Sequence, residues 1–383
     1  MATAIKKYFL TVLFFLLIWP FVLLFIPIYD NELKGVTEPV QAPAFTMASW
    51  LEGDFQKQFE PYFSFHLGLR KAAVRTASQI NYWLGVQRRE VVVGKDHELM
   101  GMEYIDALYG RDFMGNDSIQ ISVARIRKFQ QVLENNGVRF FIVVAPNKSR
   151  LYPKKIPEQF RGQSGVPTNY SVIKQELLKY QVPLVDFQEW FEQIDKSAPY
   201  PLFSNLGVHW SYYAATFCGD SLAGYIAHLL NKKANHIFYK EVNVTTTPYG
   251  TDKDMMELMN LWVDIPLRKP LAYFKTELTS DTAAYVPNVL TIGDSYYWNI
   301  IYSGIPGAFF SPNSVYFYYN TTAHFNDGRS APVKELDLKK TILQQDVVFF
   351  LYSEPNLRQL GNNIDVNFLN LMDTLSPMAT QKP

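Results

Sequence analysis

The hydrophobic positions of the chain fall into short apolar runs that alternate with longer amphipathic segments. Three runs, Val138–Ala145, Val286–Ile292 and Val347–Tyr352, are mostly apolar, which is typical of strands buried on both faces of a parallel sheet. Apolar residues recur at helical spacing between them, in residues 118–135, 170–180, 187–194, 212–230 and 332–344. This alternation predicts an α/β fold, a three-layer α/β/α sandwich with a mostly parallel sheet.

A different pattern occupies the N-terminus. Residues Tyr8–Ile28 include no charged residue and consist mainly of Leu, Phe, Val and Ile, and a run of about 20 such residues can cross a bilayer. Lys6 and Lys7 precede the run, which favours a cytoplasmic N-terminus. We therefore predict one N-terminal transmembrane helix that is not cleaved. The alternative is a signal peptide that is removed near Ala42–Ala44.

These patterns divide the chain into three predicted parts. Residues 1–30 form the membrane anchor, 31–115 a linker and a helical segment, and 116–383 the α/β domain. The stretch 235–281 is harder to read and is expected to form a cap or an insertion within the last part.

Composition narrows the possible functions. Lys and Arg together number 36, as do Asp and Glu, so no basic surface for nucleic acid is expected. Cys218 is the single cysteine, which excludes an internal disulfide, and its apolar neighbours indicate a small buried side chain. The six histidines lack metal-ligand spacing, so we predict no metal site and no cofactor.

The chemistry is expected where the strand Val286–Ile292 ends on Gly293–Asp294–Ser295. In an open α/β sheet, ligands bind at the carboxyl ends of the strands. A helix that begins here would present free backbone N–H groups, which suit a developing oxyanion. Taken alone, the tripeptide is better explained as an ordinary turn after a strand.

A second motif, Tyr200–Ser211, contains the pair His209–Trp210. With the Ser295 strand it resembles the SGNH-hydrolase-like acetyltransferases of bacterial exopolysaccharide assembly, the AlgJ/AlgX-like family. Further segments with the same order and spacing are Phe55–Arg70, Val92–Lys95, Ala145–Lys148 and Glu354–Leu357. The resemblance implies an SGNH-like fold with Ser295 as nucleophile and His209 as base.

The sequence leaves the identity of the third catalytic residue undecided. In the alginate proteins an aspartate lies two residues before the histidine, and here that position is Gly207. Asp186 and Glu354 follow apolar strands, so either is a candidate acid to orient His209, and the site could also work as a dyad. Asp294 ranks last because neighbouring side chains usually diverge.

For the oxyanion we expect the backbone N–H of Ser295 and the side chain of Asn320, with Asn299 and Asn356 as alternatives. Several side chains are candidate substrate contacts. The aromatic rings of Trp210, Tyr296 and Trp298 would stack on sugars. Lys148 would contact an acidic sugar or a partner. Packing in the core, or solvation of the lysine, is the alternative for these residues.

The resemblance implies an extracytoplasmic O-acetyltransferase that moves an acetyl group through an acyl-serine onto a cell-surface or secreted polysaccharide. An MBOAT-type membrane acyltransferase would supply the acetyl group as a partner. The chain would then be a single-pass protein of the inner membrane, with its N-terminus in the cytoplasm and its catalytic domain in the periplasm. The alternatives are a carbohydrate acetylesterase with the same Ser/His pair and a non-catalytic glycan-binding scaffold subunit.

Overall fold

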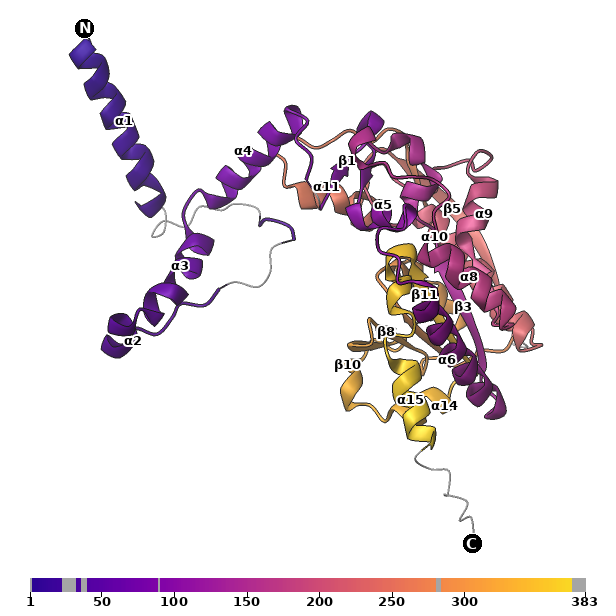
Figure 1. The fold of residues 1–383 in the computed structure, drawn as a ribbon. Coiled ribbons are helices and arrows are strands. Elements are labelled where there is room, and N and C mark those ends of the chain that lie inside the picture. The colour runs from indigo at the N-terminus through magenta and orange to yellow at the C-terminus, as the bar shows by residue number, and fades with distance from the viewer. Residues whose placement is uncertain (1, 23–31, 36–39, 89, 280–283, 374–383) are drawn as a thin grey trace. The chain divides into compact units, whose positions relative to one another are not determined.

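The computed structural model describes residues 2–22, 32–35, 40–88, 90–279 and 284–373 (Figure 1). The chain divides into two compact units. The smaller unit comprises Met1–Arg88 together with Met256–Ile265, and the larger comprises Arg89–Met255 together with Pro266–Pro383. The three parts predicted from the sequence remain predictions.

The smaller unit is helical and contains α1 (Ala2–Val22), α2 (Met47–Glu52), α3 (Asp54–His66) and α4 (Arg70–Trp83). No helix in the described part of the chain is long and apolar enough to cross a membrane. The structure therefore does not support the transmembrane helix predicted over Tyr8–Ile28, of which residues 23–28 lie outside the described residues.

The larger unit is built on a sheet of seven strands among the described residues, in the order β10-β9-β8-β7-β11-β3-β4. The strands β8, β7, β11, β3 and β4 run parallel, and β9 and β10 extend the sheet antiparallel. Their bounds are β3 Arg139–Ala145, β4 Leu184–Asp186, β7 Val289–Gly293, β8 Val315–Tyr318, β9 Thr322–Phe325, β10 Ser330–Pro332 and β11 Val347–Ser353. The predicted mostly parallel α/β sheet is confirmed.

Alternate residues of the central strands pack against different helical layers, as the pleat requires. Phe140 and Phe350 contact Phe129 of α6 (Asn116–Asn135), which also contacts α15 (Ile364–Asp373). Phe141 and Phe349 contact the other layer, which holds α10 (Tyr212–Leu229) and α12 (Tyr296–Tyr302). Apolar residues on both strand faces thus give a sheet covered on both sides.

The remaining helices and strands of the larger unit are short. They are β1 Val92–Val93, β2 Leu99–Met100, α5 Met102–Leu108, α7 Lys148–Leu151, α8 Asn169–Lys179, α9 Phe187–Ile194, α13 Ile305–Phe309 and α14 Leu338–Leu343. Within the stretch 235–281, β5 (His236–Thr245) pairs antiparallel with β6 (Leu271–Thr279). The helix α11 (Asp254–Met259) lies between these two strands in sequence.

One predicted element is wrong in part. The helix expected over residues 332–344 is reduced to α14, because the sheet takes the first residues of the segment. Pro332 pairs with Thr322 at the sheet edge, and the backbone N–H of Val333 donates to the carbonyl of Thr321. Asp337 then caps α14 by accepting from the backbone N–H of Lys340.

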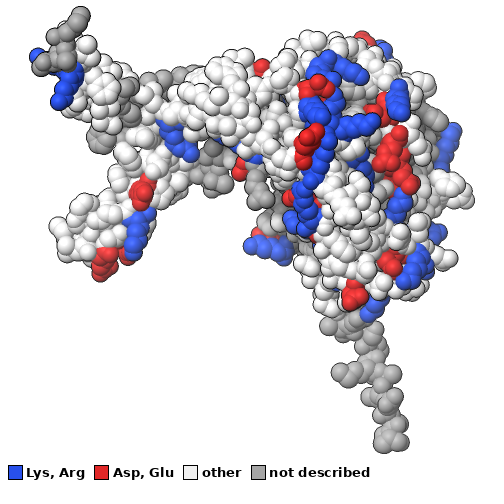
Figure 2. Space-filling view, turned by 45° about the horizontal axis from the view of Figure 1, so that its top comes forward, with Lys and Arg blue, Asp and Glu red and all other residues white. Residues whose placement is uncertain are grey.

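Positive and negative side chains lie beside one another over the visible face of the larger unit (Figure 2). In the same unit, Lys174 forms ion pairs with both Asp186 and Glu189. This mixture agrees with the equal numbers of acidic and basic residues in the sequence.

Candidate active site

Ser295 lies at the carboxyl edge of the parallel sheet, directly after β7 and Asp294, and immediately precedes α12. A Cβ at Gly293 would lie 2.2 Å from the carbonyl oxygen of Leu351 in β11, so only glycine allows β7 to approach β11 this closely here. The motif Gly-Asp-Ser is therefore a tight exit from a buried strand, and its third residue is partly exposed at the sheet edge.

Asp294 holds this exit in place and does not contact the histidine. Its Oδ2 accepts hydrogen bonds from the backbone N–H and the hydroxyl of Ser353, at 2.7 and 2.6 Å, and from Nδ2 of Asn356 at 2.8 Å. Its Oδ1 accepts from the backbone N–H of Tyr296 at 3.1 Å. With these four donors the buried carboxylate joins the end of β7 to the end of β11.

His209 lies on a loop closed by a bridge between Phe203 and Trp210. Its Nε2 is 2.8 Å from Oγ of Ser295, although the two residues are 86 positions apart. The imidazole also packs against the ring of Tyr296, with centroids 4.7 Å apart. The structure thus brings together the two residues that the sequence motifs single out.

The acid beside the histidine is Asp254, the first residue of α11. Its Oδ2 lies 2.5 Å from Nδ1 of His209, and its Oδ1 accepts from the backbone N–H groups of Val208 and Met255, at 3.0 and 2.6 Å. Since a carboxylate only accepts, Nδ1 of His209 carries a proton, and the neutral ring is free to accept the Ser295 proton at Nε2.

Gly207 explains how this arrangement fits. A Cβ at this position would lie 2.3 Å from the carbonyl oxygen of Thr251 and 3.2 Å from Oδ1 of Asp254. The segment that carries Asp254 therefore packs directly against the Gly207 backbone. A side chain two residues before His209 is excluded, and the acid comes from a different part of the chain.

The carboxylates near His209 stabilise its protonated form, the imidazolium. Burial lowers the pKa of His209, but the charge and hydrogen bond of Asp254, with the charges of Asp294 and Asp252, outweigh burial and raise it above the ordinary value. Burial also raises the pKa of the Asp252 carboxyl to about 7. Asp252 is fully buried, and its carboxyl oxygens form no close hydrogen bond among the described residues, although Tyr273 lies near enough to lower that pKa.

The two acids predicted for this role lie elsewhere. Asp186 caps α9 and accepts from the hydroxyl of Tyr170 at 2.8 Å and from Lys174 at 2.6 Å. Glu354 is 2% exposed and accepts from Nδ2 of Asn147 at 2.8 Å and from Nε of Arg150 at 3.0 Å. Both carboxylates already have partners that fix the chain around the ends of β4 and β11.

Three of the predicted substrate contacts are instead buried groups that build the site. Lys148 is 0% exposed; its Nζ donates to the carbonyls of Leu99, Ser204 and Gly207 at 2.8, 2.6 and 2.8 Å and lies 2.8 Å from Glu98. Lys148 thereby anchors the loop that carries His209.

Trp210 and Tyr296 are also 0% exposed. Nε1 of Trp210 donates to the carbonyl of Tyr296 at 3.1 Å, and the hydroxyl of Tyr296 donates to the carbonyl of Val208 at 2.8 Å. These two bonds connect the histidine loop to α12. Trp298 is partly exposed and lines a pocket.

The predicted oxyanion donor Asn320 already has a hydrogen-bond partner. Its Nδ2 donates to the carbonyl of Asn362 at 2.9 Å. The preceding residue, Tyr319, lies beside Ser295 instead, and the side chains of Asn356 and Ser295 lower the pKa of its hydroxyl in part. Burial outweighs them and raises that pKa to about 12, so the hydroxyl keeps its proton. Tyr319 and Asn320 both have positive φ, 47° and 55°, a backbone strain that often accompanies functional sites.

The alternative asparagines have structural partners. Asn299 donates to the carbonyl of Trp210 at 2.8 Å and accepts from the hydroxyl of Thr251 at 2.9 Å. Nδ2 of Asn356 donates to Asp294 and, at 3.3 Å, to the hydroxyl of Tyr319.

Sequence reasoning missed Asp254 and Tyr319. The signal for Asp254 was indirect: Gly207 removes the expected acid, and the unassigned stretch 235–281 holds Asp252 and Asp254. Tyr319 carried no signal, because its position beside Ser295 depends on the left-handed turn after β8.

Comparison with known proteins identifies the family of the chain. A family model described as "SGNH hydrolase-like domain, acetyltransferase AlgX" matches residues 92–299, more than half of the chain. No curated protein matches the chain.

Three solved structures are similar. The O-acetyltransferase domain of Pseudomonas putida AlgJ is 18% identical over 73% of this chain and 100% of its own, with a TM-score of 0.51. Pseudomonas aeruginosa AlgX is 12% identical over 72% of this chain and 67% of its own, with a TM-score of 0.44. Bacillus cereus PatB1 with a sulfonyl adduct is 15% identical over 66% of this chain and 91% of its own, with a TM-score of 0.43.

The first of these similarities supports the SGNH-like fold. The family match covers the segment from β1 through α12, which includes His209, Asp254 and Ser295. The chain therefore belongs to the SGNH-hydrolase-like acetyltransferases of the AlgX type.

Proposed function

We propose that this protein is an extracytoplasmic serine O-acetyltransferase that acetylates hydroxyl groups of a cell-surface or secreted polysaccharide. The observation that carries the proposal is the connected series Asp254, His209 and Ser295, with contacts of 2.5 and 2.8 Å. A serine hydroxyl becomes an effective nucleophile when a positioned base accepts its proton during attack, and the base works best when a third group orients it.

In the first half-reaction, Oγ of Ser295 attacks the carbonyl carbon of an acetyl ester while Nε2 of His209 accepts the hydroxyl proton. The tetrahedral intermediate then collapses, the bond to the donor oxygen breaks, and His209 returns the proton to that oxygen. Acetyl-Ser295 remains. Asp254 holds the ring and stabilises the imidazolium, which agrees with the raised pKa of His209.

In the second half-reaction, a sugar hydroxyl attacks acetyl-Ser295 and gives its proton to His209. The acetyl group leaves on the sugar oxygen, and His209 returns the proton to Oγ of Ser295. Water in place of the sugar would make the protein an esterase, so acceptor binding decides between these two outcomes.

Two donors would stabilise the oxyanion. One is the backbone N–H of Ser295, and the other is the hydroxyl of Tyr319. Because the Tyr319 oxygen accepts a hydrogen bond from Asn356, its own proton is free to be donated toward the site. The raised pKa of Tyr319 keeps that proton in place near neutral pH.

The N-terminal segment would tether the enzyme to the inner membrane, with the N-terminus in the cytoplasm and the catalytic unit in the periplasm. Many apolar side chains of α1 are exposed, among them Phe9, Phe14 and Leu17, at 65%, 58% and 71%. An MBOAT-type membrane acyltransferase would supply the acetyl group, because an enzyme in the periplasm has no direct access to cytoplasmic acetyl-CoA.

The proposal is tested with the full-length protein in detergent, a chromogenic acetyl ester and an oligosaccharide acceptor. Ester loss and acetylated sugar are followed together by absorbance and mass spectrometry. The variants are Ser295→Ala, His209→Ala and, as a matched control, Ser303→Ala at the other end of α12.

Acetylated sugar from the wild type and Ser303→Ala, and none from the other two variants, is the expected result. Ester loss without acetylated sugar would instead assign the esterase reaction. Absence of activity in the wild type and in every variant would leave the scaffold function, although the complete Asp254–His209–Ser295 group argues against it.

A further inference from the structure

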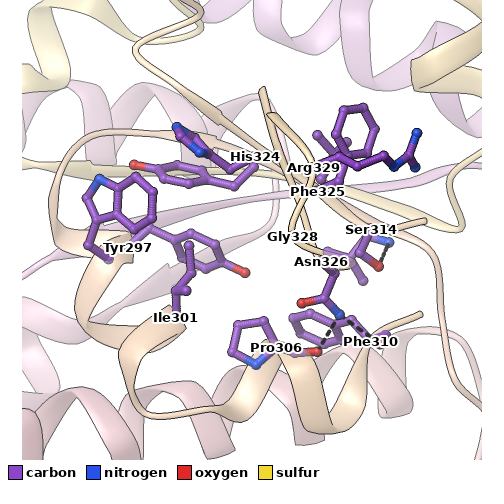
Figure 3. Close-up of a pocket in the computed structure, with 14 residues that line it drawn as sticks. Tyr297, Ile301, Pro306, Phe310, Ser314, His324, Phe325, Asn326, Gly328 and Arg329 are labelled. Atoms are coloured by element: carbon purple, nitrogen blue, oxygen red, sulfur yellow. Dashed lines mark hydrogen bonds between the residues drawn. The ribbon is translucent and has the colours of Figure 1, made fainter. Parts of the chain in front are cut away.

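A pocket of about 290 Å³ opens between α12 and α13 on one side and β8 and β9 on the other (Figure 3). Tyr297, Ile301 and Pro306 line it from the helices, and His324, Phe325 and Arg329 from the strand side. The partly exposed Trp298 also lines the pocket.

We propose that this pocket binds one uncharged pyranose ring of the acceptor glycan, next to the ring that is acetylated. This inference rests on the proposed transferase function, whose acceptor it specifies. The volume lies at the low end of the roughly 300–1,000 Å³ range of small-molecule pockets, which suits a single ring rather than an extended ligand.

The aromatic lining suits the apolar C–H face of a sugar ring. The indole of Trp298 packs edge-on against His324, Tyr316 and Tyr318, with centroids at 4.8, 5.3 and 5.8 Å. These contacts hold the indole in one orientation, so little side-chain entropy is lost when a ligand stacks on it. The wall is thus rigid, flat and apolar.

The charges in the pocket favour an uncharged ring. Nε of Arg329 is 2.7 Å from Oδ2 of Asp327, and its guanidinium lies over the ring of Phe325 at 4.7 Å. Arg329, the only cationic side chain among the described lining residues, is therefore already paired with a carboxylate. Burial lowers the pKa of His324, which leaves a neutral imidazole able both to donate to and to accept from a sugar hydroxyl.

The pocket is connected to the nucleophile. The backbone N–H of Trp298 donates to the carbonyl of Ser295 at 3.2 Å, one helical turn away. On the strand side, the Tyr318 ring contacts both Trp298 and Tyr319, at 5.8 and 4.7 Å, and Tyr319 lies beside Ser295. A row of aromatic rings therefore leads from the pocket to the reacting hydroxyl, so a glycan bound in the pocket would present its next ring to Ser295.

The test measures binding by isothermal titration calorimetry with the full chain in detergent, in a Ser295→Ala background that prevents turnover. The probes are four neutral tetrasaccharides, cellotetraose, maltotetraose, mannotetraose and chitotetraose, and the acidic tetragalacturonate. Pocket variants are Trp298→Leu and His324→Leu. The matched control is Trp83→Leu, a tryptophan of α4 that is 69% exposed.

We expect saturable binding of at least one neutral probe, weakened at least about 10-fold in both pocket variants and unchanged in Trp83→Leu. Thermal melting by circular dichroism identifies any variant that is unfolded, and His324→Phe replaces His324→Leu in that case. Absence of neutral binding, tighter binding of tetragalacturonate, or equal binding in the pocket variants would overturn the proposal. The binding assay uses the Ser295→Ala variant and does not depend on catalysis. If the acetyl-transfer experiment failed, the binding result would therefore still stand.

Discussion

Oδ2 of Asp254 lies 2.5 Å from Nδ1 of His209, across 45 positions of sequence. The acid that orients the histidine is thus carried by the segment between β5 and β6 rather than by the histidine's own loop. Gly207 makes room for this segment, because its missing side chain lets the Thr251 carbonyl approach the backbone.

Replacing the acid with its amide tests this relationship. In Asp254→Asn we expect kcat for acetyl-ester hydrolysis to fall roughly 10³–10⁴-fold, because the ring loses its orienting carboxylate. In the wild type the raised pKa of His209 means that activity is lost as pH falls through that raised value. Without the Asp254 charge, burial dominates and the acidic limb of kcat/KM moves to lower pH. The exposed Asp264→Asn serves as control, and an unshifted acidic limb would contradict this role of Asp254.

Restoring an aspartate two residues before the histidine is expected to fail. In a Gly207→Asp, Asp254→Ala double variant, the new Cβ would meet the Thr251 carbonyl at 2.3 Å, so the chain must shift rather than orient His209. Overpacking of this kind costs about 1–3 kcal/mol of unfolding free energy. Urea unfolding and ester hydrolysis should show a less stable protein with no activity gain over Asp254→Ala. Recovered activity would show that the site accepts either position of the acid.

Tyr319→Phe separates transition-state stabilisation from binding. Loss of one oxyanion donor is expected to lower kcat roughly 10²-fold and to leave KM unchanged, since the ring and its packing remain. Steady-state kinetics with the acetyl ester measure both constants, and Tyr180→Phe controls for loss of a hydroxyl elsewhere. A change confined to KM would place Tyr319 in substrate binding instead.

Lys148→Met distinguishes anchoring from substrate contact. The variant leaves three carbonyls and Glu98 without their shared cation, so we expect unfolding free energy to fall by about 3–5 kcal/mol. Urea unfolding measures the loss, with the exposed Lys334→Met as control. A normal unfolding midpoint combined with a raised acceptor KM would assign Lys148 to the substrate.

Asp252 predicts a pH dependence of stability. Burial raises the pKa of its carboxyl from 3.8 to about 7, so the folded chain keeps a proton that the unfolded chain loses above about pH 4. The contribution of Asp252 to stability is therefore most favourable below the unfolded pKa and is lost as pH rises toward about 7. Asp252→Asn should gain stability relative to the wild type across this window, as measured by urea unfolding at several pH values. The exposed Asp117→Asn should show no such trend, and parallel curves for Asp252→Asn and the wild type would contradict the prediction.

Much of the fold was predictable from local pattern. The apolar runs that form β3, β7 and β11 have few polar residues to expose on either face of a strand. They are therefore typical of strands inside a sheet that is covered on both faces. Ser295 and His209 were predicted because the order and spacing of their motifs resemble those of the SGNH-hydrolase-like acetyltransferases. The helix expected over residues 332–344 was predicted to start too early. The pairing of Pro332 with Thr322 depends on a neighbouring strand, which the local pattern does not reveal.

The sequence by itself determined the central strands and their helical cover, because periodicity is a local property, and it singled out Ser295 and His209 through motifs that resemble those of a known family. Tertiary structure alone decided which acid reaches His209 and which tyrosine reaches Ser295, since both meet their partners only through packing of distant segments. Packing also decided that Trp210, Tyr296 and Lys148 are buried supports while Trp298 lines a pocket. The burial of a side chain depends on what covers it, and the covering residues come from elsewhere in the chain.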